Sequence, residues 1–310
     1  MDNFLTIDGG TTNTRISLVQ NGKITDTLRL GIGARAGIDG NAALKSAISD
    51  GIKEILRKNS CSKVDIERIL ASGMITSEFG LCKLDHLTAP VGINELKENL
   101  FETVLSDVSD IPFVFVRGVK TSCSSLEDAD MMRGEETELM GIMSNADGEC
   151  IYVLPGSHSK IIYTDDHGRI TNFITMLTGE MIASLSQSTI LKDAVDLSIS
   201  CINDEYLLKG YDYCVWNGIN EALFKVRILK NIFGCTPEET YSFFMGVVLK
   251  DEIIKIISAP ASKVIIGGRA SIRHTMAKLL ERRSEKEVVC IDDETVDTST
   301  VKGMLKIYVQ

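Results

Sequence analysis

The sequence has 310 residues and a formal net charge of -10, because 43 Asp and Glu residues outnumber 33 Lys and Arg residues. Hydrophobic residues make up 44% of the chain and charged residues 25%, which predicts a folded chain without long disordered segments. At about 100–200 residues per domain, this length predicts two domains. The acidic balance repels phosphate backbones, and no Lys/Arg block is interleaved with aromatic residues, so we expect no nucleic-acid partner.

The cysteines and the apolar residues favour a location in the cytoplasm. The eight cysteines are scattered, and no two lie within three residues of each other, so neither a metal-ligand pattern nor a disulfide framework is expected. The most apolar long stretch, residues 173–191, is interrupted by Gly179 and Glu180, which argues against a membrane span. The first residues lack the basic region of a secretory signal, and we expect a cytoplasmic protein without a membrane partner.

The first half of the chain predicts a meander of strands followed by α/β alternation. Short apolar runs bounded by Gly or Asn-Gly turns predict strands, whereas apolar residues at helical spacing predict helices. The expected elements are strands at 4–7, 14–20 and 23–30, a helix at 41–58, a strand at 69–71, a helix at 94–105 and a strand at 113–116.

The second half repeats the opening pattern of strand, glycine turn and hairpin. The expected elements are strands at 150–154, 160–163 and 170–174, helices at 179–191, 217–233 and 236–257, a strand at 263–266, a helix at 272–283, a strand at 288–291 and a closing helix at 293–304. The repetition predicts two domains of similar architecture. We place them at residues 1–125 and 126–292, with residues 293–310 as a tail that can pack back onto the first domain.

A glycine-rich loop follows the first predicted strand. Its residues are Asp8, Gly9, Gly10, Thr11, Thr12, Asn13, Thr14 and Arg15. Adjacent glycines let the backbone approach a ligand, the threonines offer hydroxyl and amide groups, and Asp8 offers a carboxylate. This combination suits phosphate oxygens and a hydrated magnesium ion. Taken alone, the loop is equally compatible with a tight hairpin turn that the threonines merely hold.

A second glycine turn lies between two apolar strands about half a chain later. Its residues are Leu154, Pro155, Gly156, Ser157, His158, Ser159 and Lys160. Its hydroxyl, amide and ammonium groups could clamp a polyphosphate from the side opposite the first loop. When this turn is considered alone, a merely polar, solvated turn is the favoured interpretation.

An acidic helix start follows Arg133 and Gly134. Carboxylates at a helix N-terminus are stabilised by the helix dipole whatever their function. The functional interpretation is a general base, because phosphoryl transfer to an alcohol needs a carboxylate within hydrogen-bond reach of the attacking hydroxyl.

Two other nucleotide motifs were compared with the sequence. The pattern Gly-x-x-x-x-Gly-Lys-Ser/Thr does not occur, which argues against a P-loop NTPase. Residues 31–36 match the Ala-ended form of the dinucleotide fingerprint, but they follow a hairpin strand and precede more glycines rather than a helix. We interpret this match as chance, and a dinucleotide oxidoreductase would depend on it alone.

Together, the two loops and a late strand that ends in Gly267 and Gly268 resemble the actin–hexokinase–Hsp70 ATPase superfamily. Within it, five blocks of the sequence resemble the bacterial 2-dehydro-3-deoxygalactonokinase family. The blocks are residues 7–15, 72–75, 132–137, 154–160 and 178–180, and residues 264–268 add a weaker match to the superfamily. The resemblance implies an α/β fold of two ribonuclease-H-like domains of the actin/hexokinase type, with a nucleotide cleft between them.

The resemblance also implies an activity: ATP-dependent, magnesium-assisted phosphorylation of the 6-hydroxyl of 2-dehydro-3-deoxy-D-galactonate, in galactonate breakdown. Asp8 would hold magnesium through water, and Glu135 would be the catalytic carboxylate, with Glu136 as the alternative. The residues implied for the nucleotide and its phosphates are Asp8, Gly10, Thr11, Thr12, Gly156, Ser157, His158, Ser159, Gly267 and Gly268. The candidates on the substrate side are Arg133, Arg35, Gly73 and Met74.

The sequence departs from the family pattern at two places. We expect an aromatic residue after the first-loop aspartate, where this chain has Gly9. We also expect Ser-Arg-Gln-Gly-Trp after residues 73–75, where this chain has the stretch Thr76 to Leu81. The second departure removes an Arg and a Trp near the sugar site that the resemblance implies, so a kinase for a different keto-deoxy sugar acid stays open. A second alternative is a nucleotide-driven ATPase switch or activator of the same superfamily, which would not need Glu135 or an acceptor. A homodimer is also left open.

Overall fold

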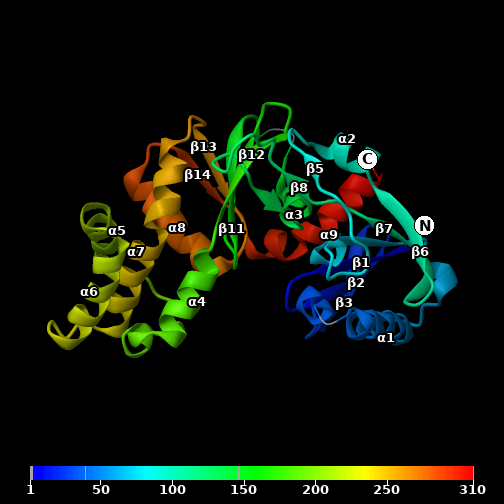
Figure 1. Cartoon of the computed structure of the whole chain (residues 1–310), viewed down its shortest axis with the longest axis horizontal. Coiled ribbons are helices and arrows are strands. Elements are labelled where there is room, and N and C mark those ends of the chain that lie inside the picture. Colours follow the sequence, from blue (N-terminus) through cyan, green and yellow to red (C-terminus); the bar gives the residue numbers. More distant parts are fainter. Residues whose placement is uncertain (1–2, 39, 145–146, 310) are drawn as a thin grey trace. The chain divides into compact units, whose positions relative to one another are not determined.

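A computed structural model of the chain describes residues 3–38, 40–144 and 147–309 (Figure 1). These residues form two compact units. The first unit contains the described residues of 1–147, 167–172 and 294–310, and the second contains residues 148–166 and 173–293. No helix among the described residues is both long enough and apolar enough to cross a membrane. All eight cysteines are free thiols.

The first unit is built on a six-stranded sheet in the order β3-β2-β1-β4-β7-β6. Its strands are β1 (Asn3–Gly9), β2 (Thr14–Gln20), β3 (Lys23–Leu30), β4 (Arg68–Gly73), β6 (Phe101–Leu105) and β7 (Ser109–Phe115). A smaller sheet contains β5 (Leu87–Thr88), β8 (Val119–Lys120) and β9 (Met131–Met132). The helices are α1 (Ala42–Lys58), α2 (Ile93–Glu98), α3 (Glu135–Ile142) and α9 (Asp293–Val309), with 3-10 turns η1 (Ala34–Gly37), η2 (Lys63–Asp65) and η3 (Met74–Thr76).

The second unit is built on a five-stranded sheet in the order β12-β11-β10-β13-β14. Its strands are β10 (Cys150–Leu154), β11 (Ser159–Thr164), β12 (Ile170–Met176), β13 (Lys263–Ile266) and β14 (Glu287–Cys290). Its helices are α4 (Thr178–Ser188), α5 (Asp204–Asn217), α6 (Ile219–Asn231), α7 (Pro237–Ser258) and α8 (Ala270–Arg283), with the 3-10 turn η4 (Ile190–Asp193). The helix α7 is buried along most of its length and supplies much of the apolar core of this unit.

The same strand pattern occurs in both units. In the first, β1 pairs antiparallel with β2 and parallel with β4. In the second, β10 pairs antiparallel with β11 and parallel with β13. Because parallel strands end at the same edge of a sheet, the loops after β1 and β4 leave one edge together, and so do those after β10 and β13. Both predicted glycine loops lie at such edges.

Two sequence predictions of secondary structure were wrong in part. The helix expected at 94–105 ends at Glu98, and β6 occupies Phe101–Leu105, because alternate side chains of this edge strand are half-buried on the sheet. The helix α5 was not predicted, although its buried residues Leu207, Gly210, Tyr211 and Cys214 recur at helical spacing. The closing helix predicted at 293–304 is present and continues to Val309.

Residues 126–144 and 147 lie in the first unit, although the sequence analysis places the start of the second domain at residue 126. The reason is that α3 packs against β4 and against the closing helix α9. The nucleotide cleft expected between two domains, the cytoplasmic location and the homodimer stay predictions.

Two glycines allow α3 and α9 to touch backbone to backbone. A Cβ atom on Gly141 would lie 1.8 Å from the carbonyl oxygen of Ser299, and one on Gly303 would lie 1.9 Å from that of Thr137. Since real atoms do not approach so closely, the crossing requires both glycines. The contact holds the acidic start of α3 in place.

We expect Gly303→Ala to lower the free energy of unfolding by about 3 kcal/mol, because the added methyl group forces the two helices apart. Gly31→Ala is the control, since no atom lies within 4 Å of a Cβ built there. Urea unfolding followed by circular dichroism measures both variants. Equal stability of the two would show that α3 and α9 do not meet at this crossing.

Candidate functional site

The first glycine loop is a tight turn at the end of β1. The amide of Gly10 donates to the carbonyl of Asn13 at 2.9 Å, which closes the turn. Thr11 and Thr12 are exposed, so their hydroxyl and amide groups are accessible to a ligand. A Cβ on Gly9 would lie 2.7 Å from the Cβ of Ile75. This packing explains why Gly9 stands where an aromatic residue was expected.

Residues 31–36 support the first loop through backbone hydrogen bonds. The amide of Ala34 donates to the carbonyl of Gly10 at 3.0 Å, and that of Arg35 donates to the carbonyl of Thr11 at 2.9 Å. A Cβ on Gly33 would lie 2.5 Å from the Gly10 oxygen. The segment leads into the 3-10 turn η1 and not into the helix of a dinucleotide site. Its glycines therefore serve close packing, and Arg35 reaches the loop through its backbone while its side chain is exposed.

Three loops of the first unit meet at the carboxyl edge of its sheet. Asp8 lies opposite Ser72 in the parallel register, and Gly9 lies opposite Gly73. Gly73 and Gly134 have φ angles of 88° and 111°, which L side chains rarely adopt. A Cβ on Gly134 would lie 3.2 Å from the Cα of Gly73. These contacts bring the start of α3 next to the first loop.

Asp8 and Glu135 are close enough for their charges to interact. Burial raises the pKa of Asp8 above its usual range, Arg15 partly opposes this shift, and the charge of Glu135 adds to it. The nearest Arg15 nitrogen is 3.9 Å from the Asp8 carboxylate, whose side chain remains 30% exposed. A cation at this edge would relieve the repulsion between the two carboxylates.

Glu136 is the more enclosed of the two candidate bases. Its side chain is fully buried, and its two carboxylate oxygens accept from the Gly134 amide at 2.9 and 2.8 Å. Thr137 donates to Glu136 at 3.1 Å and shares a 2.6 Å hydrogen bond with Ser72. Burial, reinforced by the charge of Glu135, raises the pKa of Glu136 to about 8. A buried and mostly protonated carboxyl cannot take a proton from an acceptor at neutral pH.

Glu135 is better placed for that task because it is only half-buried. One of its oxygens accepts from the Arg133 amide at 3.0 Å, which orients the carboxylate at the start of α3. The geometry therefore favours Glu135 over Glu136 as the base.

The guanidinium of Arg133 is already bound within the first unit. It donates to the carbonyl and hydroxyl of Thr76 at 2.9 and 2.8 Å and to the carbonyl of Leu84 at 2.8 Å. His86 lies 3.4 Å away, and burial together with the Arg133 charge lowers the pKa of His86 to about 4, so this histidine is neutral. Met74 opens η3 beside Gly73. Through these hydrogen bonds, Arg133 connects Thr76, in the stretch that departs from the family pattern, to the start of α3.

The second glycine loop presents Ser157 and His158 to solvent, whereas Ser159 and Lys160 are buried. The first turn of α4 supports it. A Cβ on Gly179 would lie 2.3 Å from the Gly156 oxygen, the Glu180 amide donates to the carbonyl of Ser157 at 3.2 Å, and the Glu180 carboxylate lies 3.1 Å from His158.

The loop at Gly267 and Gly268 is joined to the second glycine loop. The Gly267 amide donates to the carbonyl of Val153 at 2.8 Å. Gly268 has a φ of 65°, and a Cβ there would lie 2.4 Å from the Pro155 oxygen. Arg273, which is almost fully buried, donates to the Gly268 carbonyl at 2.7 Å. The structure thus brings the six predicted residues of the second unit to one edge of its sheet.

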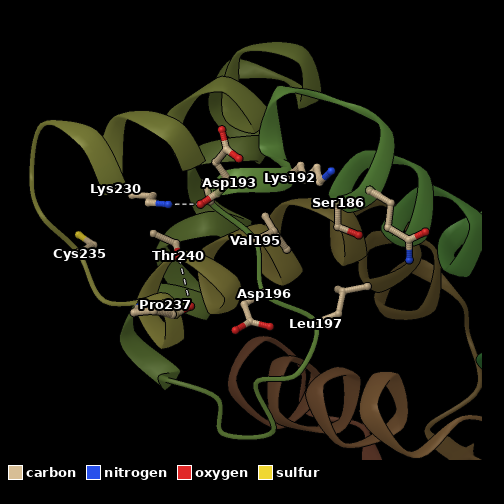
Figure 2. Close-up of a pocket in the computed structure, with 12 residues that line it drawn as sticks. Ser186, Lys192, Asp193, Val195, Asp196, Leu197, Lys230, Cys235, Pro237 and Thr240 are labelled. Atoms are coloured by element: carbon tan, nitrogen blue, oxygen red, sulfur yellow. Dashed lines mark hydrogen bonds between the residues drawn. The ribbon is translucent and has the colours of Figure 1, made fainter.

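A separate pocket of about 550 Å³ lies among the helices of the second unit (Figure 2). Its lining mixes charged, hydroxyl and apolar side chains from α4, η4, the segment after η4 and the ends of α6 and α7. None of the predicted site residues is among those that line it. This pocket is therefore separate from the candidate loops.

Metal binding by protein side chains alone is not indicated. Among the described residues, no group of three or more His, Cys, Asp or Glu side chains could hold a metal ion. The partly exposed carboxylate of Asp8 fits magnesium that keeps most of its waters and binds phosphate oxygens.

Solved structures identify the class of fold. A crystal structure from Sinorhizobium meliloti, provisionally named a 2-dehydro-3-deoxygalactonokinase, has a TM-score of 0.78 at 21% identity and covers 99% of this chain and 100% of its own. Component A of (R)-2-hydroxyglutaryl-CoA dehydratase from Acidaminococcus fermentans has a TM-score of 0.51 at 14% identity, over 99% and 96% of the two chains. The protein is a two-domain α/β protein of the actin/hexokinase type, which confirms the predicted fold class.

The family model for 2-keto-3-deoxy-galactonokinases matches residues 8–307, and the chain belongs to this family. A protein of Rhizobium meliloti (strain 1021), named a probable 2-dehydro-3-deoxygalactonokinase, is 28% identical over 130 residues. These residues are 41% of this chain and 40% of the relative, so the alignment spans less than half of either protein. The predicted family resemblance is confirmed.

Glu136 is expected to make the fold less stable as pH rises. Its pKa is about 8 in the folded state and near 4.5 in the unfolded chain. Between these values the folded state holds a proton that the unfolded state has lost. The contribution of Glu136 is therefore fully present below about pH 4.5 and is lost as pH rises through about 8.

Glu136→Gln removes this titration. Between about pH 5.5 and 7.5, the wild type should lose more stability than the variant, by on the order of 2–3 kcal/mol. Urea unfolding at the two pH values measures the difference. Parallel losses in both proteins would contradict the raised pKa.

Proposed function

We propose that the protein is an ATP-dependent kinase that phosphorylates the 6-hydroxyl of 2-dehydro-3-deoxy-D-galactonate. The observation that carries the proposal is the meeting of three groups at one sheet edge: the exposed amides and hydroxyls of the first glycine loop, the Asp8 carboxylate and the half-buried Glu135. Phosphoryl transfer to an alcohol needs phosphate binding, charge neutralisation and a base. Membership of the family supports the identity of the acceptor.

In this proposal each loop has one task. Thr11 and Thr12 hold the terminal phosphates, Ser157 and His158 bind phosphate oxygens through the second loop, and Gly267 with Gly268 borders the adenosine. Asp8 holds a hydrated magnesium ion, which when bound supplies positive charge to the phosphate oxygens. Glu135 accepts the proton of the attacking 6-hydroxyl as the oxygen bonds to the γ-phosphorus and ADP leaves.

The first test measures ADP release with Mg-ATP. The acceptors are 2-dehydro-3-deoxygalactonate, its gluconate epimer, several hexoses and a blank. We expect release only with 2-dehydro-3-deoxygalactonate. Release with the gluconate epimer alone would indicate a kinase for another keto-deoxy sugar acid. Equal release without acceptor would favour the nucleotide-driven switch.

Glu135→Gln is expected to lower kcat by about 10²-fold or more while leaving ATP affinity unchanged, because it removes the base but not the phosphate loops. Glu138→Gln is the matched control, since it removes the same charge from the same first turn of α3. Stopped assays for kcat and equilibrium ATP binding measure both variants. Near-normal turnover of Glu135→Gln would move the role to another group.

A further inference from the structure

A buried carboxyl group lies beneath the second glycine loop, and the proposed chemistry does not use it. Glu252 belongs to the middle of α7 and is 1% exposed. One of its oxygens accepts a hydrogen bond from the hydroxyl of Thr178, and the other has no hydrogen-bond partner among the described residues. Burial raises the pKa of Glu252 to about 7, and the hydroxyl of Ser159 lowers it in part.

Burying a carboxyl oxygen without a partner costs stability, and an apolar side chain would fill the same space at less cost. What the carboxyl adds is a hydrogen bond that fixes the first residue of α4. Thr178 is 3% exposed and comes from a segment 74 residues earlier in the chain. The bond therefore ties α4 to α7 at one defined point.

The first turn of α4 in turn defines the shape of the second glycine loop. Gly179 packs so closely on Gly156 that no Cβ fits between them, and Glu180 contacts both Ser157 and His158. On the opposite side of the loop, the buried hydroxyl of Ser159 lies between Glu252 and the Gly156 amide, which donates to it at 3.4 Å. Glu252 is thus connected to the predicted phosphate-binding residues of this loop in two ways: through Ser159 and through the first turn of α4.

We propose that Glu252 and Thr178 are positioning residues that hold the Gly156–Ser159 loop in the conformation that binds nucleotide phosphates. This inference rests on the proposed ATP-binding function. It assigns a role to the segment 178–180, and it places the anchor of the phosphate loop on a helix that contacts no phosphate itself. Preorganised amides bind phosphate without the entropy cost of ordering the loop.

Thr178→Val tests the anchor, because valine keeps the shape of the side chain and removes the hydroxyl. We expect the KM for ATP to rise about 10-fold, the KM for the acceptor to stay within about twofold, and kcat to change less than the KM for ATP. Thr178→Ser, which retains the hydroxyl, should restore most of the ATP affinity. Glu252→Gln keeps an accepting oxygen and should resemble the serine variant, whereas Glu252→Leu should resemble Thr178→Val.

Thr275→Val is the matched control. Thr275 is equally buried and donates only to the carbonyl of Ser271 in its own helix, so its loss should leave the KM for ATP unchanged. An equal rise in the KM for ATP in this control would show that general destabilisation causes the effect of Thr178→Val. That result would overturn the proposal.

Hydrogen exchange without nucleotide separates this proposal from the proposed function. Amides of the Gly156–Ser159 loop should exchange several-fold faster in Thr178→Val than in Thr178→Ser or Thr275→Val. If the wild type binds ATP, unchanged exchange or unchanged ATP affinity in Thr178→Val would refute only the positioning role of Thr178 and Glu252. A wild type that binds no Mg-ATP in equilibrium titration would refute the proposed function, and the positioning role would fail with it.

Discussion

Parallel pairing at the centre of each sheet is the constraint on which the candidate site depends. In the first unit it sets Asp8 beside Ser72, and in the second it sets Val153 beside Ile266. The turns that follow these strands must then leave the sheet at one edge, which is where α/β proteins bind ligands. A shift of one residue in β1 would turn Asp8 to the other face of the sheet, away from the start of α3.

The same crowding that builds the edge also sets its electrostatics. Gly73 and Gly134 let two backbones approach, and the Glu136 side chain beside this contact is fully buried. Desolvation is the largest cause of the raised pKa of Asp8 and of Glu136. One of two adjacent glutamates is thereby buried as a structural acid, while Glu135 keeps access to solvent. The difference in protonation between the pair follows from burial, not from residue type.

Much of this architecture could be predicted from sequence because its signals are local. Glycine turns after apolar strands mark the two loops, and the repeated hairpin marks the two sheets. The β6 strand was missed because an edge strand of five residues with half-buried alternate positions shows too few periods to separate it from a helix. Thr178 and Glu252 could not be paired from sequence, since nothing local relates residues 74 positions apart. For Arg133, a local signal was not enough. The sequence predicts that its charge contacts the substrate, whereas in the structure three of its hydrogen bonds go to backbone and hydroxyl groups of the same unit.

The geometry around Thr76 bears on how the acceptor is recognised. The stretch that departs from the family pattern forms a compact turn, in which a Cβ on Gly80 would lie 2.1 Å from the Ile75 oxygen and one on Gly37 would lie 2.0 Å from the Phe79 oxygen. This packing fixes the stretch to η1, whose first two amides support the first glycine loop. Under the proposed function, a residue of this stretch that binds the acceptor would be connected to the first glycine loop through η1. A sugar acid would bring a carboxylate that needs donors. The Arg133 guanidinium and the amides of Ser77, Gly80 and Leu81 already donate within the first unit, so the exposed side chain of Arg35 stays the candidate for that contact.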